Sequence, residues 1–246
     1  MYSHIVWLTD LQRSSSESLR ALAALGDPDV QVVHSGSEEQ ARSAVRELAS
    51  GLEEWGVPAT GGVVGGSAEA WADGFSDPHG LLVIGPAASG LGSTTTHILQ
   101  RPGPAVLVDR GRSFLNVSHI LCALDPADDG SPVAHAVRLA RAASAPVTFL
   151  HVLDVTQTAD PDEVLGLMRA HVAASRPPGD PVRAHFEVGI AETAAEGICS
   201  VADQKASLVV IGSHARRGLA RLLLGSVAEH VARSCPVPVL VVRPTP

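Results

Sequence analysis

Short apolar runs alternate with longer amphipathic stretches along the chain, which predicts strands separated by helices. In the second half the expected strands lie at 118–125, 147–153, 183–188, 207–212 and 238–243. After the first of these, "SPVAHAVRLARAAS" (131–144) places Val133, Val137 and Ala140 on one helical face. Strands that alternate with helices indicate right-handed crossovers and a parallel sheet covered on both faces. We therefore expect a doubly wound α/β fold.

The apolar runs of the first half return in the second half in the same order. The matching segments are "SHIVWLTD" (3–10) with "SHILCALD" (118–125), "VQVVHS" (30–35) with "VTFLHV" (147–152), "GGSAEAWADG" (65–74) with "VGIAETAAEG" (188–197), "GLLVIG" (80–85) with "SLVVIG" (207–212), and "AVLVDR" (105–110) with "PVLVVR" (238–243). A repeat of about 115 residues is too long for a solenoid and indicates a duplicated domain. We expect one unit at 1–112 and a second at 113–246, each with a five-stranded parallel sheet.

Composition and charge narrow the classes of function. Hydrophobic residues make up 45% of the chain and aromatic residues 3%, so the core is built from Val, Leu, Ile and Ala. A formal net charge of −8 disfavours a nucleic-acid-binding surface. Three widely spaced cysteines disfavour a disulfide or zinc framework. Without a signal-peptide pattern or a long apolar run, we expect a soluble cytoplasmic protein that does not insert into membranes.

The stretch "GSHARRGLARLLLGS", residues 212–226, joins an expected strand to an expected helix. Free N–H groups and the helix dipole favour an anion at such a junction, and two adjacent arginines add positive charge. Ser226 followed by Glu229 is a capping-box pattern, so we expect Ser226 to cap the helix. The Walker pattern and GxGxxG are both absent, which disfavours a P-loop enzyme and a dinucleotide dehydrogenase.

The run "LVVIGSHARRGLARLLLGSVAEHVARSCPVPVLVVR" resembles the universal stress protein family. The chain as a whole resembles the tandem two-domain form, more closely over 118–243 than over 1–110. Nucleotide-binding members of the family carry a loop of the form G-x2-G-x9-G-[S/T]. Gly212, Gly225 and Ser226 keep this spacing, and Ala215 stands where the family has its second glycine.

The resemblance implies a stress-associated regulatory protein that binds ATP or a related adenine nucleotide, with Mg²⁺ as the accompanying ion. Asp125 is then expected near the ribose or a phosphate-bound metal, and Val152 beside the adenine. The other expected nucleotide-binding residues are Gly212, His214, Ala215, Arg216, Gly225, Ser226 and Val227. The resemblance also implies the strand order 3-2-1-4-5 in each unit. It implies an internal pseudo-dimer in which Val239–Val242 lies antiparallel to Ala105–Val108, and it leaves a further homodimer open.

The first half lacks the nucleotide-type loop. Its segment from Gly85 to Val106 is six residues shorter than its counterpart and has lost the glycine spacing. Gly90, Gly92 and Ser93 are left either as a small anion nest or, more simply, as a shortened turn in which Ser93 caps a helix. We therefore expect a degenerate first domain, with any nucleotide site confined to the second.

Other candidate chemistry has less support. The eleven histidines form no HExxH motif, and we interpret His34 and His151, at equivalent strand ends, as structural. We interpret Asp128 and Asp129 as a solvated loop that caps a helix at Ser131, rather than as a metal site. Since no GxSxG elbow is present either, we expect a binding protein and not an enzyme, with slow ATP hydrolysis as a minor possibility. The alternative is a scaffold that binds no nucleotide and acts through dimerisation or partner docking.

Overall fold

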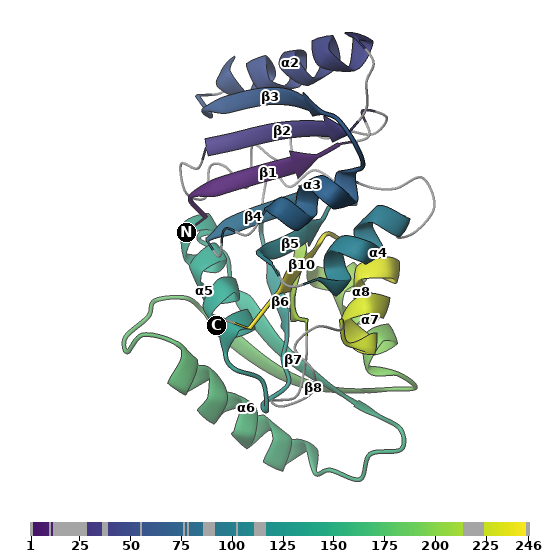
Figure 1. Cartoon of the computed structure of the whole chain (residues 1–246). Helices are drawn as coiled ribbons and strands as arrows, with labels where there is room; N and C mark the ends of the chain where they lie inside the picture. Colours follow the sequence, from purple (N-terminus) through teal and green to yellow (C-terminus); the bar gives the residue numbers. More distant parts are fainter. Residues whose placement is uncertain are drawn as a thin grey trace. The chain divides into compact units, whose positions relative to one another are not determined.

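The computed structural model describes residues 2–9, 11, 29–35, 39–54, 56–75, 77, 79–85, 92–101, 103–110, 117–213 and 224–244. The chain divides into two compact units, which we call unit 1 (Met1–Asn116) and unit 2 (Val117–Pro246). Figure 1 labels their helices and strands. The domain boundary expected after residue 112 lies within 111–116, outside the described residues. Each unit is described by itself below.

Unit 1 is a parallel sheet with helices between its strands. Its strands are β1 (His4–Leu8), β2 (Asp29–Ser35), β3 (Ala59–Val64), β4 (Gly80–Ile84) and β5 (Ala105–Val108), in the spatial order β3-β2-β1-β4-β5. All neighbouring strands in this order run parallel. Its described helices are α2 (Glu39–Glu54), α3 (Ala68–Gly74) and α4 (Ser93–Gln100). The order confirms the expected 3-2-1-4-5 arrangement.

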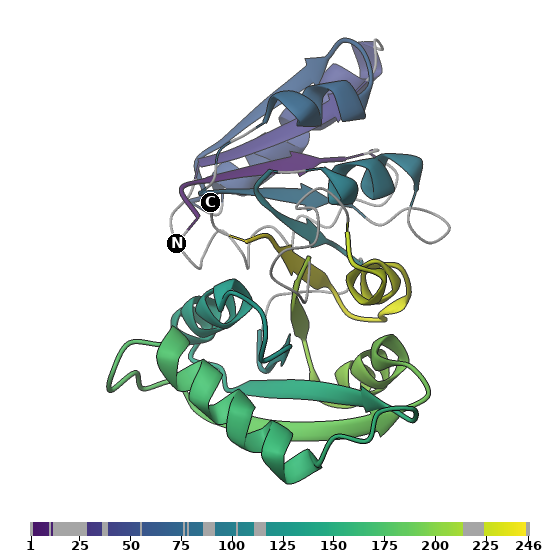
Figure 2. The same ribbon diagram turned by 60° about the horizontal axis from the view of Figure 1, so that its bottom comes forward.

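Unit 2 repeats this plan. Its strands are β6 (Ile120–Ala123), β7 (Val147–Asp154), β8 (Ala184–Ala191), β9 (Leu208–Gly212) and β10 (Val239–Val242), in the order β8-β7-β6-β9-β10 with parallel neighbours. Its helices are α5 (Ser131–Ala143), α6 (Pro161–Ser175), α7 (Ala194–Lys205) and α8 (Ser226–Ser234). Helix α5 contacts α6, and α7 contacts α8. Figures 1 and 2 show the two helix pairs on opposite faces of the sheet, as a doubly wound fold requires.

The helices of the described part are short and flank the sheets. None of them combines the length and the apolar character that crossing a membrane would require. Their buried faces consist mainly of Ala, Val, Leu and Ile, which matches the low aromatic content of the chain. The helices therefore owe their stability to packing against the sheets.

The strand registers align four of the five pairs of repeated segments as the sequence predicts. They correct the alignment of the third pair, residues 65–74 with residues 188–197. In that third pair, His34 of β2 lies opposite Val63 of β3, and His151 of β7 lies opposite Val188 of β8. Val188 therefore corresponds to Val63 and not to Gly65, so the predicted alignment is wrong by two residues. Both segments open a helix and share small and acidic residues there, and this common composition produced the shifted match.

The third strands of the two units are packed by different means. A Cβ built on Gly61 of β3 would lie 2.8 Å from the carbonyl oxygen of Val45, so α2 lies close against the strand. The corresponding residue of unit 2 is Phe186, whose ring stacks on the buried Phe149 at a centroid distance of 5.5 Å. In unit 1 the helix α2 therefore packs directly on the third strand, whereas in unit 2 an aromatic pair fills the corresponding space.

Candidate functional site

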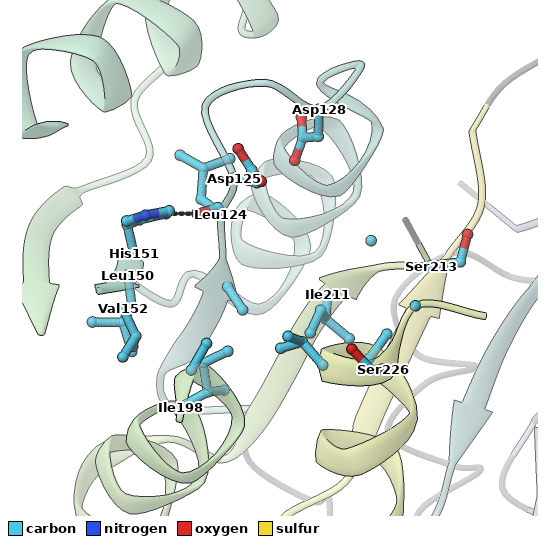
Figure 3. A pocket seen from close by; sticks show the side chains of 16 residues that line it. Leu124, Asp125, Asp128, Leu150, His151, Val152, Ile198, Ile211, Ser213 and Ser226 are labelled. Atoms are coloured by element: carbon cyan, nitrogen blue, oxygen red, sulfur yellow. Dashed lines mark hydrogen bonds between the residues drawn. The ribbon is translucent and has the colours of Figure 1, made fainter. Parts of the chain in front are cut away.

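Unit 2 contains a cavity of about 440 Å³ beyond the carboxyl ends of β6, β7 and β9 (Figure 3). Its lining residues are Ala123, Leu124, Asp125, Asp128, Leu150, His151, Val152, Ala194, Ile198, Ile211, Gly212, Ser213, Gly225, Ser226, Val227 and Ala228. Doubly wound folds bind ligands at this edge of the sheet. The volume also lies in the range of small-molecule sites, so the cavity is the candidate functional site.

Six of the nine residues expected from the sequence line this one cavity. They are Asp125, Val152, Gly212, Gly225, Ser226 and Val227. They come from four separate elements: the end of β6, the end of β7, the end of β9 and the start of α8. The other three, His214, Ala215 and Arg216, lie outside the described residues.

The first turn of α8 faces the cavity without a side-chain cap. Its N-cap is Gly225, which has no side chain that could bond to the first N–H groups, and Ser226 is the first helical residue. The expectation that Ser226 caps α8 is therefore wrong by one residue, and so is the same expectation for Ser93, because Gly92 is the N-cap of α4. Since the N-cap residue offers no side chain to the first N–H groups of α8, this turn as described is suited to an anion.

Ser213 is a site residue that the sequence reasoning missed. It is 2% exposed, its N–H donates to the carbonyl of Val242 at 2.7 Å, and its own carbonyl accepts from Gly225 N at 2.8 Å. These two bonds join the end of β9 to β10 and to the start of α8. Ser213 thus fixes the helix terminus relative to the sheet edge, although only its position after "LVVIG" pointed to it.

The loop between β6 and α5 is built from consecutive aspartate turns. Asp125 Oδ1 accepts from Ala127 N at 2.9 Å, and Asp129 Oδ1 accepts from Ser131 N at 3.0 Å. Asp129 is exposed, as expected, and its carboxylate accepts from the first N–H of α5, although the N-cap itself is Gly130. Asp128 differs from the expectation, because it is 7% exposed and lines the cavity instead of lying in solvent.

Asp128 is buried against α6. Its Oδ1 accepts from Gly130 N at 2.7 Å and lies 2.8 Å from Nε2 of His171. Burial raises the pKa of Asp128, and the hydrogen bond from Gly130 and the contact with His171 partly oppose this rise. His171 is the second functional candidate that the sequence did not reveal, because it lies 43 residues away along the chain.

His151 has a structural bond at the rim of the cavity. Its Nδ1 lies 2.8 Å from the carbonyl oxygen of Leu124, and since a carbonyl only accepts, Nδ1 carries the proton. His34 of unit 1 makes the same bond to the carbonyl of Thr9 at 2.8 Å. These bonds support the structural interpretation of both residues. In the described part of the chain no group of three His, Cys, Asp or Glu residues could hold a metal ion.

Comparisons with known proteins relate the chain to one family. The model of the Universal stress protein family matches residues 116–243. A universal stress protein of Mycolicibacterium smegmatis is 34% identical over 185 residues, which cover 67% of this chain and 62% of that protein. A universal stress protein of Methanocaldococcus jannaschii is 42% identical over 62 residues, or 25% of this chain and 36% of that protein. The matches thus span less than two thirds of either relative.

Solved structures show the same fold over the whole chain. A universal stress protein from Archaeoglobus fulgidus has a TM-score of 0.76 at 18% identity, with 98% of this chain and 96% of that chain covered. A putative universal stress protein from Pseudomonas aeruginosa has a TM-score of 0.71 at 20% identity, with 99% and 94% covered. At these identities the similarity establishes the fold alone.

Proposed function

The chain belongs to the universal stress protein family, and from this premise we propose that unit 2 binds ATP or a related adenine nucleotide in its cavity. The observation that carries the proposal is that the six described residues expected for a nucleotide all line that cavity. The protein would act as a stress-associated regulatory module whose nucleotide-bound and nucleotide-free forms differ in activity toward partners.

The two ends of the cavity suit the two ends of a nucleotide. Val152 and Ile198 provide an apolar wall for the base. The uncapped first turn of α8 offers N–H groups and the positive end of the helix dipole to the phosphates. We assign Asp125 to the ribose or to a phosphate-bound Mg²⁺, because its carboxylate lines the cavity at the end of β6.

We propose binding without efficient turnover. Phosphoryl transfer requires positive groups positioned against the charge that develops on the transferred phosphate. The described wall of the cavity contains no Lys or Arg. The sequence also lacks the Walker pattern, whose lysine would supply such a group, so we propose that the protein holds a nucleotide without hydrolysing it efficiently.

We also propose the tandem form, with the two halves paired through their last strands. β5 and β10 each stand at the end of their unit's strand order, and an uncovered edge is an aggregation hazard. Antiparallel pairing of Val239–Val242 with Ala105–Val108 would cover both edges. Slow hydrogen exchange at every amide of β10 would support this pairing, and fast exchange at alternate amides would contradict it.

Calorimetric titration of the full chain with ATP, ADP, AMP and cyclic AMP tests the nucleotide proposal. Ser226→Glu places a carboxylate at the first residue of α8, where it is compatible with the helix but repels phosphate. Ser93→Glu makes the same change at the first residue of α4 in unit 1. We expect ATP to bind the wild type and Ser93→Glu equally, and Ser226→Glu at least about a hundredfold more weakly. No binding to the wild type at millimolar nucleotide would overturn the proposal and leave the scaffold role.

A further inference from the structure

The cavity contains a buried carboxylate that the expected nucleotide residues do not account for. The Asp128 side chain is 5% exposed, yet it lines the cavity (Figure 3). A buried charge is costly unless hydrogen bonds compensate for the water it gives up. Its Oδ1 has this compensation from Gly130 N and from His171 Nε2. Among the described residues nothing donates to the second oxygen, Oδ2.

Helix α6 holds this carboxylate in place. His171 and Ser175 are one helical turn apart and therefore lie on one face of α6. His171 reaches Asp128, while a Cβ at Gly130 would lie 2.5 Å from Ser175 Oγ. Gly130 also has a φ of 81°, so only glycine fits at this close approach. The loop and α6 are thus fitted to each other, which positions Oδ2 at the cavity wall.

The chemistry of Oδ2 restricts what it can bind. An ionised carboxylate oxygen accepts hydrogen bonds and repels phosphate. In Figure 3 Asp128 lies across the cavity from Ser226, at the first turn of α8 where the phosphates are expected. A neutral hydrogen-bond donor suits Oδ2. In an adenine nucleotide these donors are the sugar hydroxyls and the amino group of the base, and the base is expected at Val152, so the hydroxyls remain for Asp128. Carboxylates recognise ribose hydroxyls in the same way in dinucleotide-binding folds.

We propose that Asp128, positioned by His171, selects ligands by their sugar hydroxyl groups and so makes the cavity specific for ribonucleotides. This inference rests on the proposed nucleotide function of unit 2. His171 acts only through Asp128, as a positioning residue. Asp128 would accept a hydrogen bond from the ribose. The family resemblance implies this role for Asp125 and gives none to Asp128.

The test compares the affinity of ATP with the affinities of its 2′-deoxy and 3′-deoxy analogues, measured by calorimetry on the full chain. For the wild type we expect ATP to bind about ten- to a hundredfold more tightly than at least one analogue, because a hydrogen bond to a charged group is lost. In Asp128→Asn the two donors hold the amide oxygen, and an NH₂ group then faces the cavity. This variant keeps the shape of the side chain, and we expect its preference for ATP to fall to about twofold or less. Asp129→Asn, on the exposed neighbour, is the matched control and should keep the full preference.

Two substitutions at His171 separate positioning from general destabilisation. His171→Gln retains a side-chain N–H donor and should keep most of the preference for ATP, whereas His171→Leu should lose it. A purely structural role would weaken ATP and its analogues equally and leave their ratio unchanged. A wild type that binds ATP and both analogues equally, or an Asp128→Asn protein with the full preference, would overturn this inference and leave the nucleotide function intact. A wild type that binds none of them would overturn both.

Discussion

Units 1 and 2 share a strand order but treat the junction between the fourth strand and the following helix differently. Both helices begin after a glycine N-cap with no side-chain cap, Gly92 for α4 and Gly225 for α8. In unit 1, Glu69 of α3 accepts a 2.5 Å hydrogen bond from Thr94 Oγ1 in the first turn of α4. In unit 2 the first turn of α8 faces the cavity. One unit supplies the anion from its own chain, and the other leaves room for an external one.

At the carboxyl edge of the sheet, too, unit 2 leaves space that unit 1 fills. Ala123 lines the cavity at the end of β6, and the corresponding residue of β1 is Leu8, which is 6% exposed. The larger side chain occupies volume that alanine leaves free. A duplicated fold can therefore keep its strand order while a few side chains decide whether a ligand has space.

The largest contrast that can be tested is the aromatic pair of unit 2. Phe149→Ala removes a fully buried ring stacked on Phe186 and should lower the free energy of unfolding by about 3–5 kcal/mol. Val32 holds the same register position in unit 1 and is also fully buried. Val32→Ala should cost only about 1–3 kcal/mol. Urea unfolding followed by far-UV circular dichroism measures both, and equal losses would contradict this account of the two cores.

Acidification should weaken unit 2 through His135. Burial, assisted by the positive charge of Arg138, lowers the pKa of His135 from 6.5 to about 4. Between these values the unfolded chain binds a proton that the folded chain does not, so stability falls as the pH falls. The loss is about 2 kcal/mol between pH 7 and pH 5. In unit 1 the pKa of Glu69 is lowered by its bond to Thr94, so its contribution is lost only below about pH 4.5.

Urea unfolding at the two pH values tests this difference. The tryptophans, Trp7, Trp55 and Trp71, all belong to unit 1, so their fluorescence follows that unit while circular dichroism follows both. His135→Gln should remove most of the pH dependence seen by circular dichroism. The same pH dependence in the variant and the wild type would show that His135 does not cause it.

The same substitution at two helical glycines should weaken ATP binding only in the unit that contains the cavity. A Cβ at Gly197 would lie 2.7 Å from Cγ1 of Val152, whereas a Cβ at Gly74 would meet nothing within 4 Å. Valine has little rotamer freedom with which to yield, so Gly197→Ala should displace Val152 and weaken ATP binding about tenfold. Gly74→Ala should leave ATP binding unchanged and raise stability by up to about 1 kcal/mol. Equal ATP affinities for the two variants would show that Val152 does not contribute to ATP binding.

The smallest expected effect concerns the internal anion of unit 1. Glu69→Gln keeps a side-chain acceptor for Thr94 but removes the negative charge beside the first turn of α4. We expect a loss of about 0.5 kcal/mol in unit 1, seen by tryptophan fluorescence during urea unfolding, and a smaller loss at high salt. A variant as stable as the wild type at low salt would show that the carboxylate does not stabilise α4.

Much of the fold could be predicted from apolar runs, because strands buried on both faces must be nearly continuously apolar. The resemblance placed Asp125 and Val152 at the ends of two such runs, and these residues line one cavity because parallel strands bring their carboxyl ends to one edge. The shifted third repeat shows where the sequence pattern stops defining the strand register. Small and acidic residues recur at the starts of helices because they cap the helix or favour it. Their recurrence therefore does not define how two strands align.

The buried part of the site could not be predicted, because it depends on contacts distant in sequence. Two adjacent aspartates look alike in the sequence, yet Asp129 is exposed and bonds to the first N–H of α5, while Asp128 is buried against His171 of α6. Only the packing of α6 against the loop separates the two roles. The N-caps of α4 and α8 were placed one residue late, because a serine beside a glycine satisfies the same capping pattern.

The number of nucleotides bound per chain shows directly whether unit 2 binds a nucleotide and unit 1 does not. Native mass spectrometry of the full chain in excess ATP measures this number, because each bound nucleotide adds its own mass. We expect one ATP per chain, held by unit 2. Two per chain would show that unit 1 also binds and that its internal carboxylate does not replace a ligand, and none would contradict the nucleotide function itself.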